Sequence, residues 1–439
     1  MNLTRKATHH EFDFEIWYAT LSQHTWDSAA LLFSPARAQA CVNYYQGELQ
    51  CSSHVRGALG RSLTALLVRS LLTPPRSLHN QARFNGRATV FTAADRDVLR
   101  ELEASLDREM QSLGSDDGAG FFVRMSNRSP KDGMPLDPSS LRTKLVSMLP
   151  ESISTADDDA EALFRGASAN DAMTAYCGAQ LHCLRVTSGR EAMCLLLSSE
   201  RVFVDLNQAL ECAKDANDVW QTSCILRKWD EGLRHDWEFR CFVYENVLTA
   251  VSQYNHYCTF PDVRAAAETG DGRTLRREIV AYWETMRDDV VPASYVMDLC
   301  KRCDGTWVLI ELNPFLTTTG ACLFTWRADH AVLYGEDEVG EEDGGAGRVI
   351  PISERPTEDG LPPLRVRQTD MPGLKDLVEA CIMPLLRMSR SRECVAFDPG
   401  QRGDGPWDAF LELAGEKAAA SAAAKATEGS EGGGGCSMC

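Results

Sequence analysis

Two polar residues interrupt an apolar stretch in the last third of the chain. The stretch reads WVLIELNPF, and its polar members are Glu311 and Asn313. Side chains alternate along a strand, so we expect Leu309, Glu311 and Asn313 on one face and Leu312 on the other. A bare buried charge is costly, whereas two oxygen-bearing side chains on a rigid strand suit a magnesium ion that also holds phosphate oxygens. The alternative is a strand end whose polar side chains simply face water.

A second acid lies just upstream, in the short apolar run YVMDLC. This acid, Asp298, is separated from the first stretch by Asp304 and Gly305, and Asp-Gly between two strands is a strong hairpin signal. Pairing across that turn would bring Asp298 near Glu311 and Asn313. Two carboxylates so close repel each other unless a cation lies between them. The sequence therefore predicts a site with three oxygen ligands, which suits magnesium and not zinc.

Basic residues that suit a triphosphate follow another predicted strand. Arg124 lies within the run VRMSN, and the Ser-Pro turn that comes next carries Arg128 and Lys131. Arginine offers a fork of donors that matches phosphate oxygens, so these three cations are candidate phosphate contacts. The alternative is a solvated basic loop.

Two further strands carry candidates for contacts with the nucleotide. The segment CILRKW ends with Arg227, Lys228 and Trp229, and its backbone and indole could line an adenine slot. The alternative is a plain core strand with the two cations at its rim. Glu238 and Arg240 alternate along the next strand and could form an ion pair that shapes the same cleft, although an isolated pair is more often structural.

The composition is that of a globular protein, and it narrows the choice of partner. The chain has 439 residues, 44% of them hydrophobic and 25% charged, with a net charge of −18. A phosphate backbone would be repelled by this charge, so we expect no nucleic-acid partner. No run of about 18 apolar residues occurs and the N-terminus lacks a signal-peptide core, so we expect a cytoplasmic protein without a membrane span. The 16 cysteines are then expected to be reduced and to pack as small apolar residues.

The spacing of apolar residues predicts interleaved helices and strands, with several hairpins. Helical signals dominate the N-terminal quarter, and a Ser/Asp/Ala-rich stretch at 151–172 is typical of a loop or linker. The densest strand signals lie at 222–254, where Glu245 and Asn246 form a two-residue turn, and a helix is expected at 273–289. Such interleaving predicts an α+β fold or a mixed α/β sheet.

Changes in composition divide the chain into a folded body, an acidic loop with a C-terminal extension, and a disordered tail. We expect these parts at 11–335, 336–414 and 415–439. The tail ends with Cys436 to Cys439, which have the form of a prenylation site. An incidental cysteine pair is the favoured interpretation, because no polybasic patch precedes it.

Seven short motifs, taken together and in this order, resemble those of the cell division cycle protein 123 family. They lie at residues 17–18, 128–132, 226–229, 238–243, 252–254, 311–315 and 323–326. The resemblance implies an ATP-grasp-like fold, in which ATP and magnesium lie between two sheet-bearing lobes, here expected at about 11–220 and 221–335. It also implies an assembly chaperone for eukaryotic translation initiation factor 2 that uses ATP and binds the gamma subunit, rather than an enzyme.

The resemblance also assigns roles to individual residues. The implied magnesium ligands are Asp298, Glu311 and Asn313, and the implied nucleotide contacts are Arg124, Arg227, Lys228, Trp229, Glu238 and Arg240. Two departures from the family concern ATP affinity more than fold. This chain has Leu197 where a lysine is frequent, and Glu311 where aspartate is usual. The alternatives are a divergent paralogue with another client and an ATP-dependent carboxylate–amine ligase, because fold does not fix function.

Overall fold

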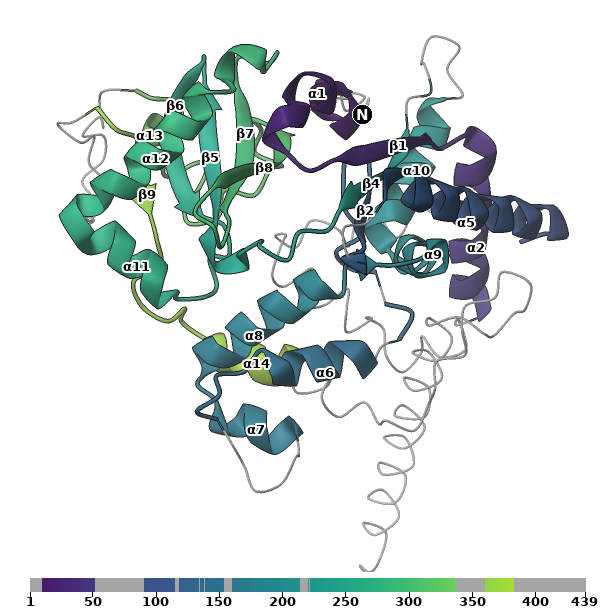
Figure 1. The fold of residues 1–439 in the computed structure, drawn as a ribbon, viewed down its shortest axis with the longest axis horizontal. Helices are drawn as coiled ribbons and strands as arrows, with labels where there is room; N and C mark the ends of the chain where they lie inside the picture. Colours follow the sequence, from purple (N-terminus) through teal and green to yellow (C-terminus); the bar gives the residue numbers. More distant parts are fainter. Residues whose placement is uncertain are drawn as a thin grey trace, which may run out of the picture.

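The strands of this protein form two separate sheets (Figure 1). The computed structural model describes residues 10–51, 91–114, 118–133, 135–137, 139–153, 160–213, 220, 222–336 and 360–382. The first sheet has the order β1-β4-β2-β3 and consists of β1 (Ser28–Leu32), β2 (Phe121–Met125), β3 (Arg185–Val186) and β4 (Ser223–Lys228). The second sheet has the order β8-β7-β5-β6-β9 and consists of β5 (Glu238–Tyr244), β6 (Val247–Gln253), β7 (Tyr295–Lys301), β8 (Trp307–Pro314) and β9 (Leu364–Arg365).

We call the first sheet, with the helices packed on it, the first lobe. The second sheet, with its helices, is the second lobe. Strands β1 to β4 are paired antiparallel, and so are β5 to β8, whereas β9 runs parallel to β6. The predicted α+β class with two sheet-bearing lobes is confirmed by this arrangement.

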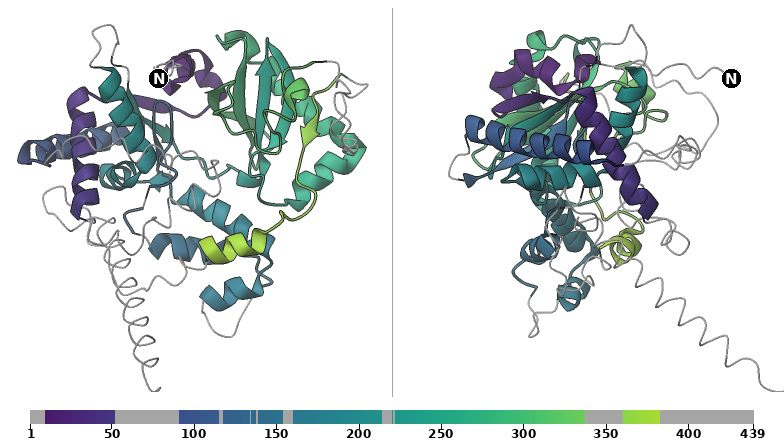
Figure 2. Two further views of the ribbon diagram at one scale, coloured as in Figure 1. Left: turned by 180° about the vertical axis from the view of Figure 1, so that it is seen from behind. Right: turned by 90° about the vertical axis from the view of Figure 1, so that its right-hand side faces the viewer.

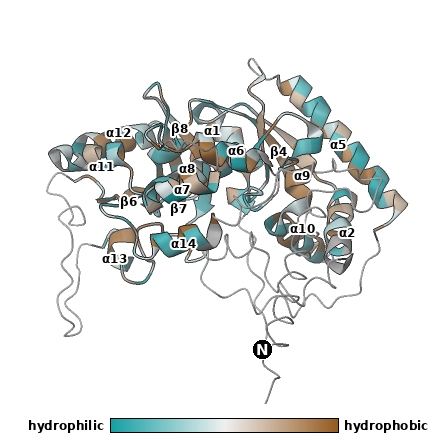
Figure 3. Cartoon of the chain, turned by 90° about the horizontal axis from the view of Figure 1, so that it is seen from below, coloured by the Kyte–Doolittle hydropathy of each residue, from teal (hydrophilic) through white to brown (hydrophobic). Residues whose placement is uncertain are grey.

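Four helices pack on the first sheet and enclose an apolar core. They are α2 (Pro35–Cys51), α5 (Ala93–Leu113), α9 (Gly189–Ser198) and α10 (Glu200–Cys212). Helix α5 begins at a capping box formed by Thr92 and Asp95, and it buries Leu99, Leu102 and Leu106 at helical spacing. Helix α9 is buried over most of its length, because it packs against α5 and α2 in the core of the first lobe, and Figure 3 shows its hydrophobic colouring.

The two faces of the second sheet differ in what covers them. One face packs in a continuous apolar core with α1 (Phe14–Leu21), α8 (Ala169–His182), α11 (Pro261–Glu268) and α12 (Arg273–Glu284). On the opposite face, Phe242, Ala250 and Val296 pack against Phe324 and Leu333, which follow β8 in the chain. The rest of that face is polar, and it carries the predicted site.

A group of helices lies below both sheets in the views of Figures 1 and 2. It consists of α6 (Ser139–Ser147), α7 (Ala160–Gly166), α8 and α14 (Leu374–Cys381). The loop or linker predicted at 151–172 is wrong in its second half, because α7 lies there and α8 begins at Ala169. The hydroxyl of Ser168 caps α8 by accepting from the amide of Asp171, so these polar residues mark a helix start.

The remaining helices are short. They are α13 (His330–Leu333) and the 3-10 segments His10–Phe12, Ser22–His24, His235–Trp237, Thr269–Gly272 and Arg287–Asp289. Within the described residues, no helix has the length and apolar character needed to cross a membrane.

The strands predicted at 222–254 are confirmed as β4, β5 and β6. Glu245 and Asn246 have φ values of 48° and 61°, the left-handed conformation of a two-residue hairpin turn. The helix predicted at 273–289 is α12, which ends at Glu284 and is followed by a 3-10 turn. Strand β1, in contrast, lies in a quarter of the chain where the sequence predicts mostly helix.

The boundaries between the lobes, as the strand pairing gives them, differ from the expected ones. Strand β4 pairs with β1 and β2, so the chain leaves the first sheet after Lys228 rather than near residue 221. Strand β9 pairs with β6 and α14 packs near α8, so part of the expected extension at 336–414 belongs to the second lobe. The acidic runs of that extension and the tail at 415–439 lie outside the described residues.

Candidate functional site

The β7–β8 hairpin places the three predicted magnesium ligands at neighbouring positions. Asp298 lies directly opposite Glu311 in the antiparallel ladder, and Asn313 lies opposite Val296. Gly305 in the connecting turn has a φ of 85°, a left-handed conformation that glycine adopts without strain. The hairpin and the proximity of the two carboxylates are therefore confirmed.

A β-bulge in β8 decides which side chains face the site. Leu309 and Glu311 pair with consecutive residues of β7, so Ile310 is the extra residue of β8. The alternation shifts at this point: Leu309 and Leu312 both enter the core, and Glu311 lies on the opposite face with its partner Asp298. The predicted shared face of Leu309 and Glu311 is wrong, because a periodic pattern does not reveal an inserted residue.

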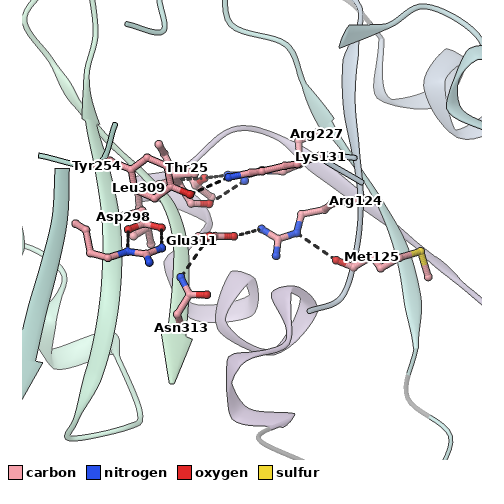
Figure 4. Close-up of polar contacts among 12 residues, drawn as sticks. Thr25, Arg124, Met125, Lys131, Arg227, Tyr254, Asp298, Leu309, Glu311 and Asn313 are labelled. Carbon is pink, nitrogen blue, oxygen red and sulfur yellow. Dashed lines mark hydrogen bonds and ion pairs between the residues drawn. The ribbon is translucent and has the colours of Figure 1, made fainter. Parts of the chain in front are cut away.

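Side chains from both lobes contact Glu311. Arg124 of β2 donates from Nη1 to Oε2 of Glu311 at 3.0 Å, and Nδ2 of Asn313 donates to Oε1 at 3.3 Å (Figure 4). Burial acts to raise the pKa of Glu311, but Arg124, Lys131 and Arg240 outweigh it and lower the pKa well below the usual range. The carboxylate of Glu311 therefore stays ionised although little of it is exposed.

Asp298 is fully buried and forms a two-pronged ion pair with Arg240 of β5. Nε and Nη2 of Arg240 donate to the two carboxylate oxygens at 2.8 and 2.7 Å, and Nη1 donates to the carbonyl of Gly320 at 2.7 Å. The pair offsets the cost of burying each charge. The predicted pair between Glu238 and Arg240 is thus replaced by a pair that joins two neighbouring strands.

Lys131 and Tyr254 join the site from different lobes. Nζ of Lys131 donates to the hydroxyl of Tyr254 at 2.8 Å, and the guanidinium of Arg240 lies 5.0 Å from the centre of the same ring. Burial acts to lower the pKa of Lys131, but Tyr254, Glu311 and Glu238 outweigh it and raise the pKa above the usual range. Tyr254 lies in the motif at 252–254 that carries the family resemblance, but no role at the site is predicted for it from the sequence. A sequence feature that could have suggested this role is the position of Tyr254 directly after β6, the strand that pairs with the strand of Arg240.

Glu238 differs from the other two acids in its charge. Burial raises the pKa of Glu238 to about 8; Asp298 and Glu311 add to the rise, while Lys131 opposes it. At neutral pH this carboxyl is largely protonated. We call the whole set the interlobe cluster: Arg124, Lys131, Glu238, Arg240, Tyr254, Asp298, Glu311 and Asn313.

Three predicted nucleotide contacts have partners elsewhere. Nε of Arg128 donates to Asp205 on α10 at 2.6 Å, and its Nη2 makes a second bond to the same carboxylate. Lys228 pairs with Asp27 at 3.2 Å, and Trp229 lies beside the last residue of α8. The structure therefore does not bring these three side chains into the interlobe cluster.

Arg227 connects the two lobes. Its guanidinium lies over the rings of Phe14 and Trp26, 5.0 and 4.7 Å from their centres. Nη1 donates to the carbonyl of Ile310 at 2.8 Å, and Nη2 donates to the hydroxyl of Thr25. Arg227 is 2% exposed and contacts the bulge of β8, so its terminal donors are directed at protein groups rather than at a phosphate.

Leu197, which stands where a lysine is frequent in the resembled family, occupies a core position in this chain. Leu197 is buried in the apolar core of the first lobe, where a charged lysine would be costly. Two residues on, Ser199 caps α10 by accepting from the amide of Val202 and donates to Asp132 at 2.6 Å. This segment therefore supports the loop that carries Lys131, although its own side chains form no part of the interlobe cluster.

The chemistry of the interlobe cluster fits a magnesium ion with a polyphosphate. Asp298, Glu311 and Asn313 offer oxygen ligands, which magnesium prefers, and Arg124 and Lys131 approach from the other lobe with donors for phosphate oxygens. Glu311 is the better prepared carboxylate, because both oxygens of Asp298 already accept from Arg240. In the described ranges, His, Cys, Asp and Glu side chains alone form no group of three that could hold a metal, so Asn313 and phosphate oxygens would have to complete the coordination.

Part of this chain is similar to a known protein family. The D123 family model matches residues 168–363, which run from the residue before α8 to the residue before β9 and include the β7–β8 hairpin. The match therefore covers Asp298, Glu311 and Asn313 as well as Glu238 and Arg240, but not the first sheet's β1 and β2.

Two curated relatives carry the same description. The translation initiation factor eIF2 assembly protein of Xenopus laevis is 32% identical over 147 residues, and that of Danio rerio is 34% identical over 149 residues. Each alignment covers 33% of this chain, and 42% and 40% of the two relatives, so the aligned part spans less than half of their length. A solved structure, Cdc123 from Schizosaccharomyces pombe, is 18% identical and covers 73% of this chain and 90% of that one, with a TM-score of 0.40. Residues 168–363 of this chain are therefore similar to the D123 family.

Proposed function

We propose that this protein binds ATP with magnesium and acts as an assembly chaperone for eukaryotic translation initiation factor 2. The relatives' descriptions as eIF2 assembly proteins support the chaperone role. The observation that carries the ATP role is the meeting of Glu311, Asn313 and Asp298 with cations of the other lobe. An ion and a polyphosphate are the ligands that such a mixture of oxygen acceptors and fixed cations suits best.

Five residues of the interlobe cluster have distinct tasks in this proposal. Glu311 and Asn313 would hold the magnesium ion, with Asp298 behind them, and bound magnesium would neutralise phosphate charge. Arg124 now serves as the counter-ion of Glu311, and it would turn its donors to a phosphate oxygen once the metal takes over that carboxylate. Arg240 holds the carboxyl group of Asp298 in place through two hydrogen bonds.

The proposed client is the gamma subunit of the initiation factor. The net charge of −18 favours a basic protein surface over a nucleic acid as partner. Co-precipitation of purified gamma subunit with the full chain tests the client directly. Retention of the subunit is expected, and ADP release on addition of amino acids without such retention would instead identify a carboxylate–amine ligase.

A Glu311→Gln variant tests the metal role. Gln keeps the size of the side chain and removes its charge, so we expect ATP affinity in the presence of magnesium to fall by at least about tenfold, the effect of roughly 1.4 kcal/mol. Affinity in EDTA should stay near that of the wild type. Isothermal titration calorimetry with and without magnesium measures both values.

Glu278→Gln is the matched control for this variant. Glu278 pairs with Lys301 at the surface of the second lobe, so the same chemical change is made away from the interlobe cluster. Its ATP affinity should equal that of the wild type. If Glu311→Gln and wild type bind ATP equally well in magnesium, Glu311 is not a magnesium ligand.

A further inference from the structure

The first lobe holds the bulge of β8 by two adjacent carbonyl groups. The hydroxyl of Thr25 donates to the carbonyl of Leu309 at 2.7 Å, and Nη1 of Arg227 donates to the carbonyl of Ile310 at 2.8 Å (Figure 4). Nη2 of Arg227 also donates to the Thr25 hydroxyl, which links the two contacts into one unit. The next residue along β8 is Glu311 of the interlobe cluster.

A bulge needs such partners more than a regular strand does. The extra residue interrupts the ladder between β7 and β8, and backbone carbonyls at the interruption lose their regular partners. A strand of this kind could pair one residue out of step, and a one-residue slip would turn every following side chain to the other face. For β8 such a slip would direct Glu311 into the apolar core and Leu312 toward Arg124.

Arg227 is built for this contact and not for a mobile ligand. Its guanidinium is covered by Phe14 and Trp26, which fix its plane, and both of its terminal nitrogens have protein acceptors. Burial, together with the neighbouring cation Arg124, lowers the pKa of Arg227 to about 9, so the group still carries its charge at neutral pH. A charged donor makes a stronger hydrogen bond to a carbonyl than a neutral one.

We propose that Arg227 and Thr25 are positioning residues that lock the β8 bulge and so keep Glu311 on the face of the interlobe cluster. The consequence for magnesium rests on the proposed function, but the lock itself does not. Arg227, which the sequence suggests as a nucleotide contact, thereby acts on the nucleotide site through the backbone of β8.

Thr25→Val tests the lock with little disturbance. Valine matches the shape of threonine and removes the hydroxyl that binds both Leu309 and Arg227. Thr25→Ser keeps the hydroxyl and should behave as the wild type. Thr20→Val is the matched control, because the Thr20 hydroxyl donates to the carbonyl of Asp289 at 3.0 Å and that contact lies away from the bulge. Arg227→Met removes the second donor and should give the larger effect.

Hydrogen exchange of the β8 amides, measured without nucleotide, reads the lock directly. Loss of one hydrogen bond should speed exchange across residues 307–314 by roughly three- to tenfold in Thr25→Val, with α12 unaffected. Thr25→Ser and Thr20→Val should exchange as the wild type. Wild-type rates in both Thr25→Val and Arg227→Met would overturn the lock.

ATP titration then separates this inference from the proposed function. In Thr25→Val the affinity in magnesium should weaken by a similar factor, while the affinity in EDTA stays unchanged. If wild type binds magnesium and ATP but Thr25→Val binds them equally well, the positioning role is overturned. If wild type shows no ATP binding at all, the proposed function fails, and the exchange rates still decide whether the bulge is locked.

Discussion

At the scale of single residues, the interlobe cluster carries more positive than negative charge. Arg124, Lys131 and Arg240 are its cations, whereas Glu311 is its ionised acid and Glu238 is largely protonated at neutral pH. Burial raises the pKa of Asp298, and the ion pair with Arg240 opposes that rise. A local positive excess in a chain with a net charge of −18 is suited to an anionic ligand such as a polyphosphate.

Glu238 gives a pH-dependent prediction. Its pKa is about 8 in the folded protein against an ordinary value of 4.5, so the folded state binds the proton more tightly. Its contribution to stability is complete below about pH 4.5 and is lost as the pH rises through about 8. Glu238→Gln mimics the protonated acid, so it should be more stable than wild type by about 4 kcal/mol at pH 8 and by only about 1 kcal/mol at pH 5.

Urea unfolding of both proteins between pH 5 and pH 8 measures this difference. The two curves of unfolding free energy against pH should converge at low pH and separate as the pH rises. Parallel curves would show that Glu238 is ionised in the folded protein at neutral pH, and the charge balance given above would then be wrong.

The sequence predicts residue types at the site better than their partners. Asp298, Glu311 and Asn313 converge as expected, because a hairpin and alternation along a strand are local properties. Arg128 is drawn to Asp205, a residue far along the chain on α10, and no local pattern encodes that pairing. Tyr254 was missed for the same reason, since its role depends on Lys131 from the other lobe.

At the scale of elements, the irregular features of strands and helices position the site. The bulge of β8 sets the direction of Glu311, and the start of α10 holds the loop of Lys131 through the adjacent Asp132. Helix starts follow from Ser, Thr and Asp residues that accept backbone N–H groups. The same residues made 151–172 look like a linker, because turns and helix caps share a composition.

Ser199→Ala tests the support of the Lys131 loop. The variant loses the cap of α10 and leaves Asp132 without its hydroxyl donor in a buried position, so we expect a loss of about 2 kcal/mol in unfolding free energy. Ser188→Ala removes the cap of α9 with no bond to Asp132, and a loss of about 1 kcal/mol is expected. Chemical denaturation gives both values, and equal losses would argue against the contribution of Asp132.

At the scale of the whole molecule, distant parts of the chain complete the second lobe. Strand β9 joins β6 from beyond residue 360, and Arg365 reaches across to Asp329 at 2.7 Å. Arg365 also lies 4.0 Å from the ring centre of Phe324, in the apolar group that covers one end of the sheet. Composition placed this strand in an extension, because two residues of strand carry no periodic signal.

Arg365→Met tests how far this late segment stabilises the body. Asp329 would keep a buried carboxylate without its cation, so we expect a loss of about 3 kcal/mol in unfolding free energy. The double variant Asp329→Asn with Arg365→Met should recover much of that loss, since the uncompensated charge is gone. Additive losses in the double variant would show that the two side chains act independently.

A manganese–nucleotide complex tests the central claim most directly, since manganese takes the same oxygen ligands as magnesium and gives an anomalous X-ray signal. We expect crystals of the full chain with manganese and a non-hydrolysable ATP analogue to show the ion bound to Glu311 and Asn313. Arg124 should then contact a phosphate oxygen instead of Glu311. An ion elsewhere in the molecule, with the Arg124–Glu311 pair intact, would contradict the account.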